Sequence, residues 1–410
     1  MEGCESQYYS GLVAECMTSL YRRDLTTTSG GNVSIKSPDG RIWMTPTGVD
    51  KCNVKPEQVC SITPNGEIVG SFKPTSEWKM HFDIYKERDD VNAIVHTHTP
   101  SLLTCALSHQ LPHLHSFPAV HTFLGDISMV PYRVCGSDQL ASTCAQSVRE
   151  NPHSKCFLLL NHGVLVVGSS ADEAFNRLEL LDRIASLYLV SKLHLDYTPL
   201  SSIPAAPHLL HESPFRNPQY QPCYEELFRF SKRAYDHHLV TTEHLFSMID
   251  THQPTILHTT LPLLRLTSAD ASTASVSETA NGSHLDYHSR IYERNTSVRV
   301  IFECLPLYTS ALLLLKNCYA TDIMPESFIV IGKIKYISKQ DASPAFAASC
   351  IQEGATVLLI EEYGVIVIGE SAMQAYDRLE VLEATSKAVY MCNDTSRGVF
   401  GLSAEEIAEV

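Results

Sequence analysis

An internal repeat restricts the fold of this 410-residue chain more than any other feature. The segment Gly163–Ala171 (Gly-Val-Leu-Val-Val-Gly-Ser-Ser-Ala) matches Gly364–Ala372 (Gly-Val-Ile-Val-Ile-Gly-Glu-Ser-Ala), an offset of 364 − 163 = 201 residues. The same offset pairs Arg177-Leu178-Glu179 with Arg378-Leu379-Glu380, and weaker matches continue upstream with a drifting offset. We therefore expect two tandem copies of one domain.

The boundaries of the copies follow from composition. A chain of this length exceeds the ~250–300 residues at which single cores stop growing. Six prolines lie between Tyr197 and Pro222, a composition that neither a helix nor a sheet accommodates. The prediction is a first domain over 1–196, a linker over 197–222 and a second domain over 223–410, with a mobile loop at Thr267–Ser283.

Short β-rich runs alternate with helical segments in the first copy, which predicts an α/β or α+β sheet. Residues 9–20 have helical spacing, and Ser170–Glu173 has the spacing of a capping box that opens a helix to about Lys192. The predicted strands are Arg41–Met44, Ala93–Val95, Ile127–Tyr132, Cys156–Leu160 and Val164–Val167.

Charge and composition exclude several classes of function. A net charge of −15 and no basic stripe argue against nucleic-acid binding. No run of ~18 apolar residues is present, which argues against a membrane protein. The thirteen cysteines form no CxxC pair and follow no signal peptide, so we expect reduced thiols and a cytoplasmic protein.

Three histidines and one glutamate form a candidate metal site. His96 and His98 end an apolar run, and residues two apart in a strand point to the same face. His162 ends a second apolar run, and Glu77 lies at a predicted helix start. Catalytic zinc takes about three protein ligands, with histidine nitrogen a frequent donor. The alternatives are a histidine bonded to backbone and a carboxylate that stabilises a helix N-terminus.

Amide-rich turns form a candidate anion site. Two adjacent glycines in Thr28–Ser34 expose backbone amides, and the neighbouring asparagine and serine add donors. Thr47-Gly48 and Thr75-Ser76 are similar points. Three ordinary turns remain the alternative.

In chain order these segments resemble the class II aldolase and adducin family over about Tyr9 to Lys192. The resemblance rests on five blocks, which are Ser29–Ser34, Met44–Val49, Pro74–Trp78, Val95–His98 and Asn161–Gly163. It implies a three-layer α/β/α fold, present here in two tandem copies.

The resemblance also implies the roles of individual residues. His96, His98 and His162 would hold one Zn²⁺ per chain, and Glu77 would transfer the proton and also touch the metal. The substrate phosphate would be bound by eight residues: Ser29, Gly30, Gly31, Asn32, Thr47, Gly48, Thr75 and Ser76. Zinc would stabilise the enediolate left by retro-aldol cleavage.

One position departs from the family pattern. In fuculose-phosphate aldolases a tyrosine of the neighbouring subunit protonates the leaving alkoxide, and our alignment places Ser116 there. Serine is a poor acid, so His115, His121 and Tyr132 are the candidates for that role. The nearby pair His113 and His115 is expected to lie in a loop.

The second copy is expected to lack the metal site. Our alignment pairs Glu77 with His284, and the three histidines His96, His98 and His162 with Phe302, Cys304 and Tyr363, respectively. The Gly-Gly-Asn turn is replaced by the stretch Leu245-Phe246-Ser247. We expect a catalytically inactive domain that serves assembly, and a homo-oligomer in which a dimer imitates the four-fold ring of the family.

The expected function is a zinc-dependent aldolase that cleaves a phosphorylated ketose or deoxy sugar. A 4-epimerase, a dehydratase or a decarboxylase would use the same site. The alternative of another class is a non-catalytic interaction protein like adducin. Small phosphorylated sugars, and neither nucleic acid nor membrane, are the expected partners.

Overall fold

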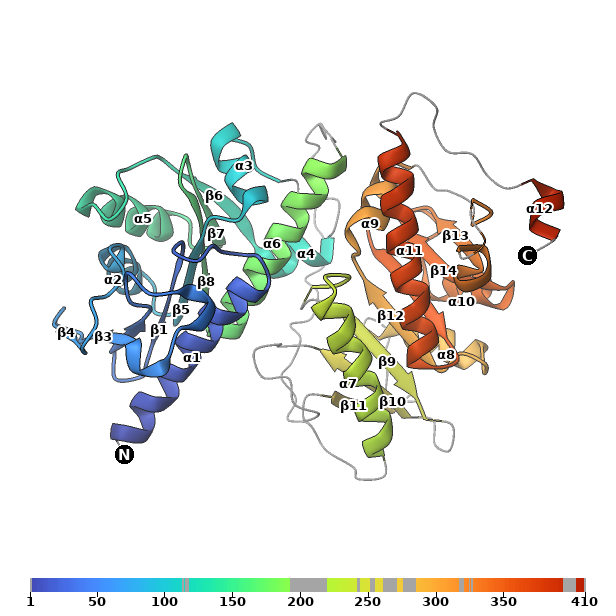
Figure 1. Ribbon diagram of the computed structural model, residues 1–410, viewed down its shortest axis with the longest axis horizontal. Coiled ribbons are helices and arrows are strands. Elements are labelled where there is room, and N and C mark those ends of the chain that lie inside the picture. Colours follow the sequence, from blue (N-terminus) through green and yellow to red (C-terminus); the bar gives the residue numbers. More distant parts are fainter. Residues whose placement is uncertain are drawn as a thin grey trace. The chain divides into compact units, whose positions relative to one another are not determined.

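The computed structural model shows two compact units, the first drawn mainly from residues 1–186 and the second mainly from residues 187–410 (Figure 1). None of the described helices is long and apolar enough to span a membrane. The residues described are 2–112, 114, 118–191, 220–241, 244–250, 255–260, 271–275, 285–316, 321–323, 325, 327–393 and 403–408.

The first unit contains an eight-stranded sheet in the order β4-β3-β2-β1-β5-β8-β7-β6. Neighbouring strands are antiparallel except β6 and β7, which are parallel. The strands are β1 Asn32–Lys36, β2 Ile42–Met44, β3 Cys60–Ile62, β4 Ile68–Val69, β5 Ala93–Thr97, β6 Asp126–Val130, β7 Ser154–Leu159 and β8 Gly163–Gly168.

Helices cover both faces of this sheet. The helices are α1 Glu2–Arg22, α2 Trp78–Glu87, α3 Pro100–Ser108, α4 Pro118–Leu124, α5 Asp138–Glu150 and α6 Ala171–Ser191. On one face, α2 and α5 pack against each other and against a core that includes Ile94, Phe157 and Leu165. Helix α1 packs against β1 and β2, and helix α3 packs against β7 and β8. The α/β/α prediction is confirmed.

The second unit repeats this plan in a seven-stranded sheet, β11-β10-β9-β12-β15-β14-β13, whose one parallel pair is β13 with β14. Its strands are β9 Leu245–Ile249, β10 Thr255–Thr260, β11 Ala271–Ser275, β12 Val300–Cys304, β13 Lys333–Ile337, β14 Ala355–Ile360 and β15 Gly364–Gly369. Its helices are α7 Gln221–Asp236, α8 Asp286–Arg294, α9 Leu307–Leu314, α10 Pro344–Gln352, α11 Ala372–Asn393 and α12 Ala404–Ala408. The tandem duplication is therefore confirmed.

The repeated helix start is built in the same way in both units. Ser170 Oγ accepts from the Glu173 amide at 3.2 Å, and the Glu173 carboxylate accepts from the Ser169 amide at 2.6 Å. In the second unit, Ser371 Oγ accepts from the Gln374 amide in the same way. Each pair satisfies amides that the first turn of a helix leaves free.

The strand register corrects our alignment of the second copy by one residue. His96 lies opposite Leu165 in the first sheet, and Glu303 lies opposite Ile366 in the second. Leu165 and Ile366 are related by the repeat offset of 201 residues, since 366 − 165 = 201. Glu303, not Phe302, is therefore the counterpart of His96.

Two other expectations concern segments that are only partly described. Residues 197–219 of the predicted linker lie outside the described residues, and α7 begins at Gln221, inside the predicted linker. The predicted loop over 267–283 contains the short strand β11, so that prediction was wrong for Ala271–Ser275. Antiparallel pairing with β10 provides the backbone hydrogen bonds of β11.

Candidate metal site

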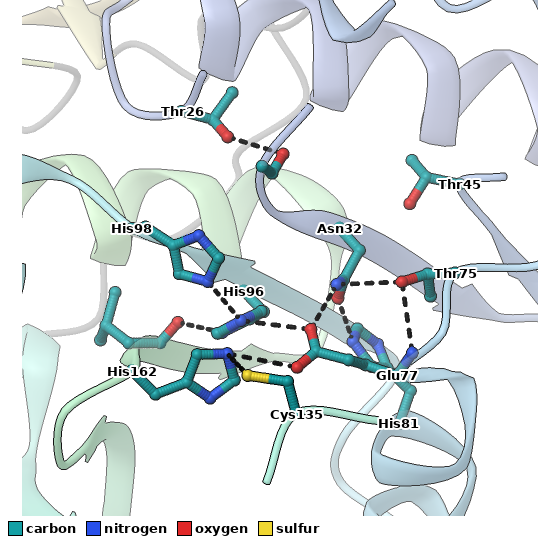
Figure 2. Close-up of polar contacts among 12 residues, drawn as sticks. Thr26, Asn32, Thr45, Thr75, Glu77, His81, His96, His98, Cys135 and His162 are labelled. Atoms are coloured by element: carbon teal, nitrogen blue, oxygen red, sulfur yellow. Dashed lines mark hydrogen bonds and ion pairs between the residues drawn. The ribbon is translucent and has the colours of Figure 1, made fainter. Parts of the chain in front are cut away.

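Four side chains from three parts of the first unit converge at one point (Figure 2). His96 is the penultimate residue of β5, and His98 follows that strand directly. His162 lies in the turn between β7 and β8, and Glu77 immediately precedes α2. The four residues are those that the sequence predicted as metal ligands.

The donor atoms are separated by the distances that a bound metal ion requires. His96 Nε2 lies 3.0 Å from His98 Nε2 and 3.3 Å from Glu77 Oε2. His162 Nε2 lies 3.2 Å from Glu77 Oε1. Two nitrogen donors ~2.0–2.1 Å from a tetrahedral zinc ion lie about 3.3 Å apart. The three histidines, whose donor atoms all lie within 4.8 Å of one another, therefore fit a zinc-sized ion, and Glu77 lies beside two of them.

Hydrogen bonds orient the His96 ring for metal binding. Its Nδ1 donates to the Val164 carbonyl oxygen at 2.8 Å, so the lone pair of the neutral ring is on Nε2, which faces His98. Among the described residues, the buried atoms Glu77 Oε1 and His162 Nδ1 have no hydrogen-bond partner. A cation between the rings would satisfy Glu77 Oε1 and separate the facing nitrogens.

The protonation states also suit a metal. Burial lowers the pKa of His96 to about 3, and burial likewise lowers the pKa of His98. Burial alone would raise the pKa of Glu77, but His96, His162 and the Asn32 amide hold that pKa well below its usual range. Neutral imidazoles and an ionised carboxylate are the forms that bind metals.

A chain of buried hydrogen bonds holds Glu77 in place. Glu77 does not cap α2; instead its Oε2 accepts from Asn32 Nδ2 at 2.8 Å. Asn32 Oδ1 accepts from His81 Nε2 at 2.5 Å, and the other ring nitrogen of His81 lies 2.7 Å from Ser34 Oγ. Ser34 Oγ in turn lies 2.8 Å from the Tyr85 hydroxyl. These contacts fix the direction of the carboxylate.

Sequence reasoning missed this chain, although a signal for it exists. Ser247 Oγ lies 2.6 Å from His288 Nδ1 and 2.8 Å from the Tyr292 hydroxyl, which repeats the contacts of Ser34, His81 and Tyr85. A search for polar residues shared by both copies would therefore have found it.

The residues expected to bind phosphate fall into three groups, which are buried, half-buried and exposed. Asn32 and Thr75 are buried, and Asn32 Nδ2 donates to Thr75 Oγ1 at 3.2 Å as well as to Glu77. The Gly30 amide donates to Thr27 Oγ1. Gly31 has a φ of +67°, and a Cβ at this position would lie 2.7 Å from the His96 carbonyl oxygen. The other members of the set, Ser29, Thr47, Gly48 and Ser76, are exposed.

Cys135 is a site residue that sequence reasoning missed. Its Sγ lies 3.3 Å from His162 Nε2, and the donor atoms of Glu77, Cys135 and His162 all lie within 4.8 Å of one another. As one of thirteen scattered cysteines, it gave no local signal.

The expected acid is not identified among the described residues. His113, His115 and Ser116 lie outside them. His121, in α4, lies 3.5 Å from the Asp126 carboxylate, and Tyr132 follows β6 with 52% of its surface exposed.

The second unit has different residues at the positions of the three histidines. Glu303 replaces His96, Leu305 replaces His98 and Tyr363 replaces His162, while His284, the aligned partner of Glu77, lies outside the described residues. The Tyr363 hydroxyl donates to Glu303 Oε2 at 2.7 Å, and His288 Nε2 lies 3.2 Å from the same oxygen. Contacts within the protein therefore engage this carboxylate.

Comparisons with known proteins find relatives of this chain. This chain is 40% identical over 177 residues to an L-fuculose phosphate aldolase of Methanococcus maripaludis (strain C7), a match that covers 42% of this chain and 93% of that protein. It is 33% identical over 182 residues to a 3-oxo-tetronate 4-phosphate decarboxylase of Escherichia coli O6:H1, covering 42% of this chain and 82% of that protein.

A solved L-fuculose 1-phosphate aldolase is similar at 30% identity and a TM-score of 0.42, covering 45% of this chain and 86% of that one. The family described as Class II Aldolase and Adducin N-terminal domain matches residues 11–189 and 247–390, one segment in each copy. The matched segments make up more than half of the sequence. This chain therefore belongs to the class II aldolase and adducin family.

Proposed function

We propose that the first copy is a zinc-dependent aldolase that cleaves a phosphorylated ketose or deoxy sugar. The observation that carries the proposal is the convergence of His96, His98, His162 and Glu77 with donor separations of 3.0–3.3 Å. The 40% identity to an L-fuculose phosphate aldolase supports a sugar phosphate as the substrate.

Each part of the site has a role in this reaction. His96, His98 and His162 would hold a zinc ion, which would supply a Lewis acid for the negative charge that develops on the substrate. Glu77, ionised and held by Asn32, delivers and removes the proton at the substrate carbon, a role that needs a base within ~3 Å of it. The exposed turns at Ser29 and at Thr47-Gly48 offer amides and hydroxyls to the phosphate.

The test combines metal analysis with a lyase assay on a panel of ketose 1-phosphates. About one zinc per chain is expected, and His96→Ala should lose both the metal and the turnover because a neutral ligand is removed. The matched control is Glu303→Ala, at the corresponding position of the second copy, which should keep both. A purified protein without zinc would instead favour a non-catalytic, adducin-like role.

A decarboxylase of a phosphorylated 3-oxo acid is the second candidate. Two observations favour it: the 33% identity to a 3-oxo-tetronate 4-phosphate decarboxylase, and the alignment of Ser116 with the expected tyrosine. Loss of carbon dioxide leaves the same kind of enediolate but needs no proton transfer at a substrate hydroxyl. Release of carbon dioxide, rather than of an aldehyde, would identify this reaction.

We further propose that the second copy binds no metal and serves assembly, as part of a dimer. The replacement of all three histidine positions by Glu303, Leu305 and Tyr363 supports this. Sedimentation analysis should find a dimer, and metal analysis should find about one zinc per chain. Two zinc ions per chain would contradict the proposal for this copy alone.

A further inference from the structure

We propose that Cys135 is a ligand of the metal in the substrate-free protein, so that a sulfur atom joins the imidazole and carboxylate donors. The proposal rests on the metal site of the proposed function and adds to it a donor of different chemistry. It assigns a role to a residue that neither the repeat nor the family motifs include.

The position of the sulfur atom is the first argument. Cys135 Sγ lies 3.3 Å from His162 Nε2, and its distance from the Glu77 donor atom is within 4.8 Å. A thiolate ~2.3 Å and an imidazole nitrogen ~2.0 Å from one tetrahedral zinc ion lie about 3.5 Å apart. The observed separation is close to that of two ligands of one ion, and without an ion the same separation allows a hydrogen bond between the thiol and the imidazole.

The second argument is independent of the cysteine. Glu77 is only 6% exposed, and its Oε1 has no hydrogen-bond partner among the described residues. This oxygen faces His162, whose Nε2 faces Cys135 Sγ (Figure 2). A buried carboxylate oxygen without a donor is unfavourable unless a cation binds it. The Glu77, His162 and Cys135 donors therefore surround a place that favours a cation.

The backbone around Cys135 holds the sulfur atom at this place. The loop from β6 to α5 turns at Gly136, where φ is +71° and a Cβ would lie 3.1 Å from the Ser76 carbonyl oxygen. Ser137 then caps α5 by accepting from the Leu140 amide at 3.1 Å. Because Ser76 directly precedes Glu77, the loop that carries the sulfur rests on the turn that carries the carboxylate.

The chemistry of the step is a ligand exchange. The Cys135 thiol releases one proton to solvent as the sulfur–metal bond forms, and neither partner is oxidised or reduced. Sulfur ligands favour softer ions such as zinc and cadmium over manganese or magnesium. Cys135 should therefore bias the site towards the softer metals.

Cobalt(II) titration of the full-length, metal-free protein tests the proposal, because a cobalt–thiolate bond gives a near-ultraviolet charge-transfer band that imidazole and carboxylate ligands do not give. The wild type should show this band together with the visible bands of cobalt. Cys135→Ser should lose the charge-transfer band but keep the visible bands, and should bind cadmium about tenfold more weakly. Cys135→Ala should behave in the same way.

The matched control is Cys52→Ser, since Cys52 is also exposed and in the first unit but belongs to no cluster of donor atoms among the described residues. It should keep the full spectrum. Visible bands without a charge-transfer band in the wild type would overturn the role of Cys135 and leave the proposed function standing. A protein that binds no cobalt at all would overturn both.

Discussion

Replacing Gly163 by alanine tests whether the His98 ring must lie where the structure places it. Gly163 begins β8, and a Cβ at this position would lie 2.5 Å from His98 Cδ2 and 2.5 Å from the Thr97 carbonyl oxygen. The φ angle of Gly163 is not in the left-handed region, so alanine strains no backbone angle. The substitution therefore acts through contact alone.

The size of the effect follows from the overlap. Ordinary contacts of a Cβ begin at 3.4 Å, so the His98 ring and the Thr97 carbonyl oxygen each have to move away from the Cβ by about 0.9 Å, the difference between 3.4 and 2.5 Å. A displacement of about 1 Å at a reacting group costs about 100-fold in activity, and disturbed support of a metal ligand costs about 10–100-fold in affinity. We expect a 100-fold loss of turnover, about 2.7 kcal/mol.

The assay is a competition between the protein and a chromophoric chelator for zinc, combined with steady-state turnover. Gly11→Ala is the matched control, because nothing lies within 4 Å of a Cβ at Gly11 in helix α1. That variant should keep its metal affinity and gain up to about 1 kcal/mol in stability. If Gly163→Ala binds zinc as tightly as the wild type and keeps its turnover, the inferred contact with His98 does not control the site.

Three further predictions follow from the buried polar groups. The folded protein disfavours protonation of His81, because burial lowers its pKa from 6.5 to about 4; its contribution to stability is therefore present above pH 6.5 and is lost as the pH falls. Between pH 7 and pH 5 the free energy of unfolding should drop by about 2 kcal/mol more in the wild type than in His81→Gln, measured by urea titration, and parallel pH curves would contradict this. Tyr363→Phe should lower the free energy of unfolding by about 1–2 kcal/mol through loss of the hydrogen bond to Glu303 without changing metal content, and a loss of zinc would refute this separation. Arg23→Ala should destabilise the first unit by about 3–5 kcal/mol in the same titration, because it leaves the Glu179 carboxylate buried without its 2.7 Å partner; a change under 1 kcal/mol would show that the pair contributes little.

Much of the fold could be predicted because its signals are local. Apolar runs bounded by turns gave the strands that became β2, β5, β6, β7 and β8, and the repeat gave the duplication. The register of β12 was harder, because Val300-Ile301-Phe302 is a continuous apolar run without a residue that marks its face. A shift of one residue moves every side chain to the other face, so Phe302 was taken for Glu303.

The site shows the same division between local and distant signals. The histidine ligands lie next to apolar runs and within family motifs, so the sequence pointed to them. Cys135 reaches the site only because α5 packs on α2 and the loop before it rests on Ser76. Such a contact depends on tertiary packing, for which the residues around Cys135 have no pattern. Asn32 was expected to bind phosphate, and only its hydrogen bonds showed that it also holds Glu77.

The serine, histidine and tyrosine contacts shared by both units have a consequence for engineering. Ser247, His288 and Tyr292 keep the arrangement of Ser34, His81 and Tyr85 in the unit that lacks the histidine ligands, so these contacts belong to the framework, on which the first unit also positions Glu77 through Asn32. The strands and helices of the second unit therefore already place residues at the positions that correspond to the ligands of the first unit. Introducing Glu303→His, Leu305→His and Tyr363→His together would place three imidazoles on it, with the first unit of the same chain as the internal standard for metal affinity.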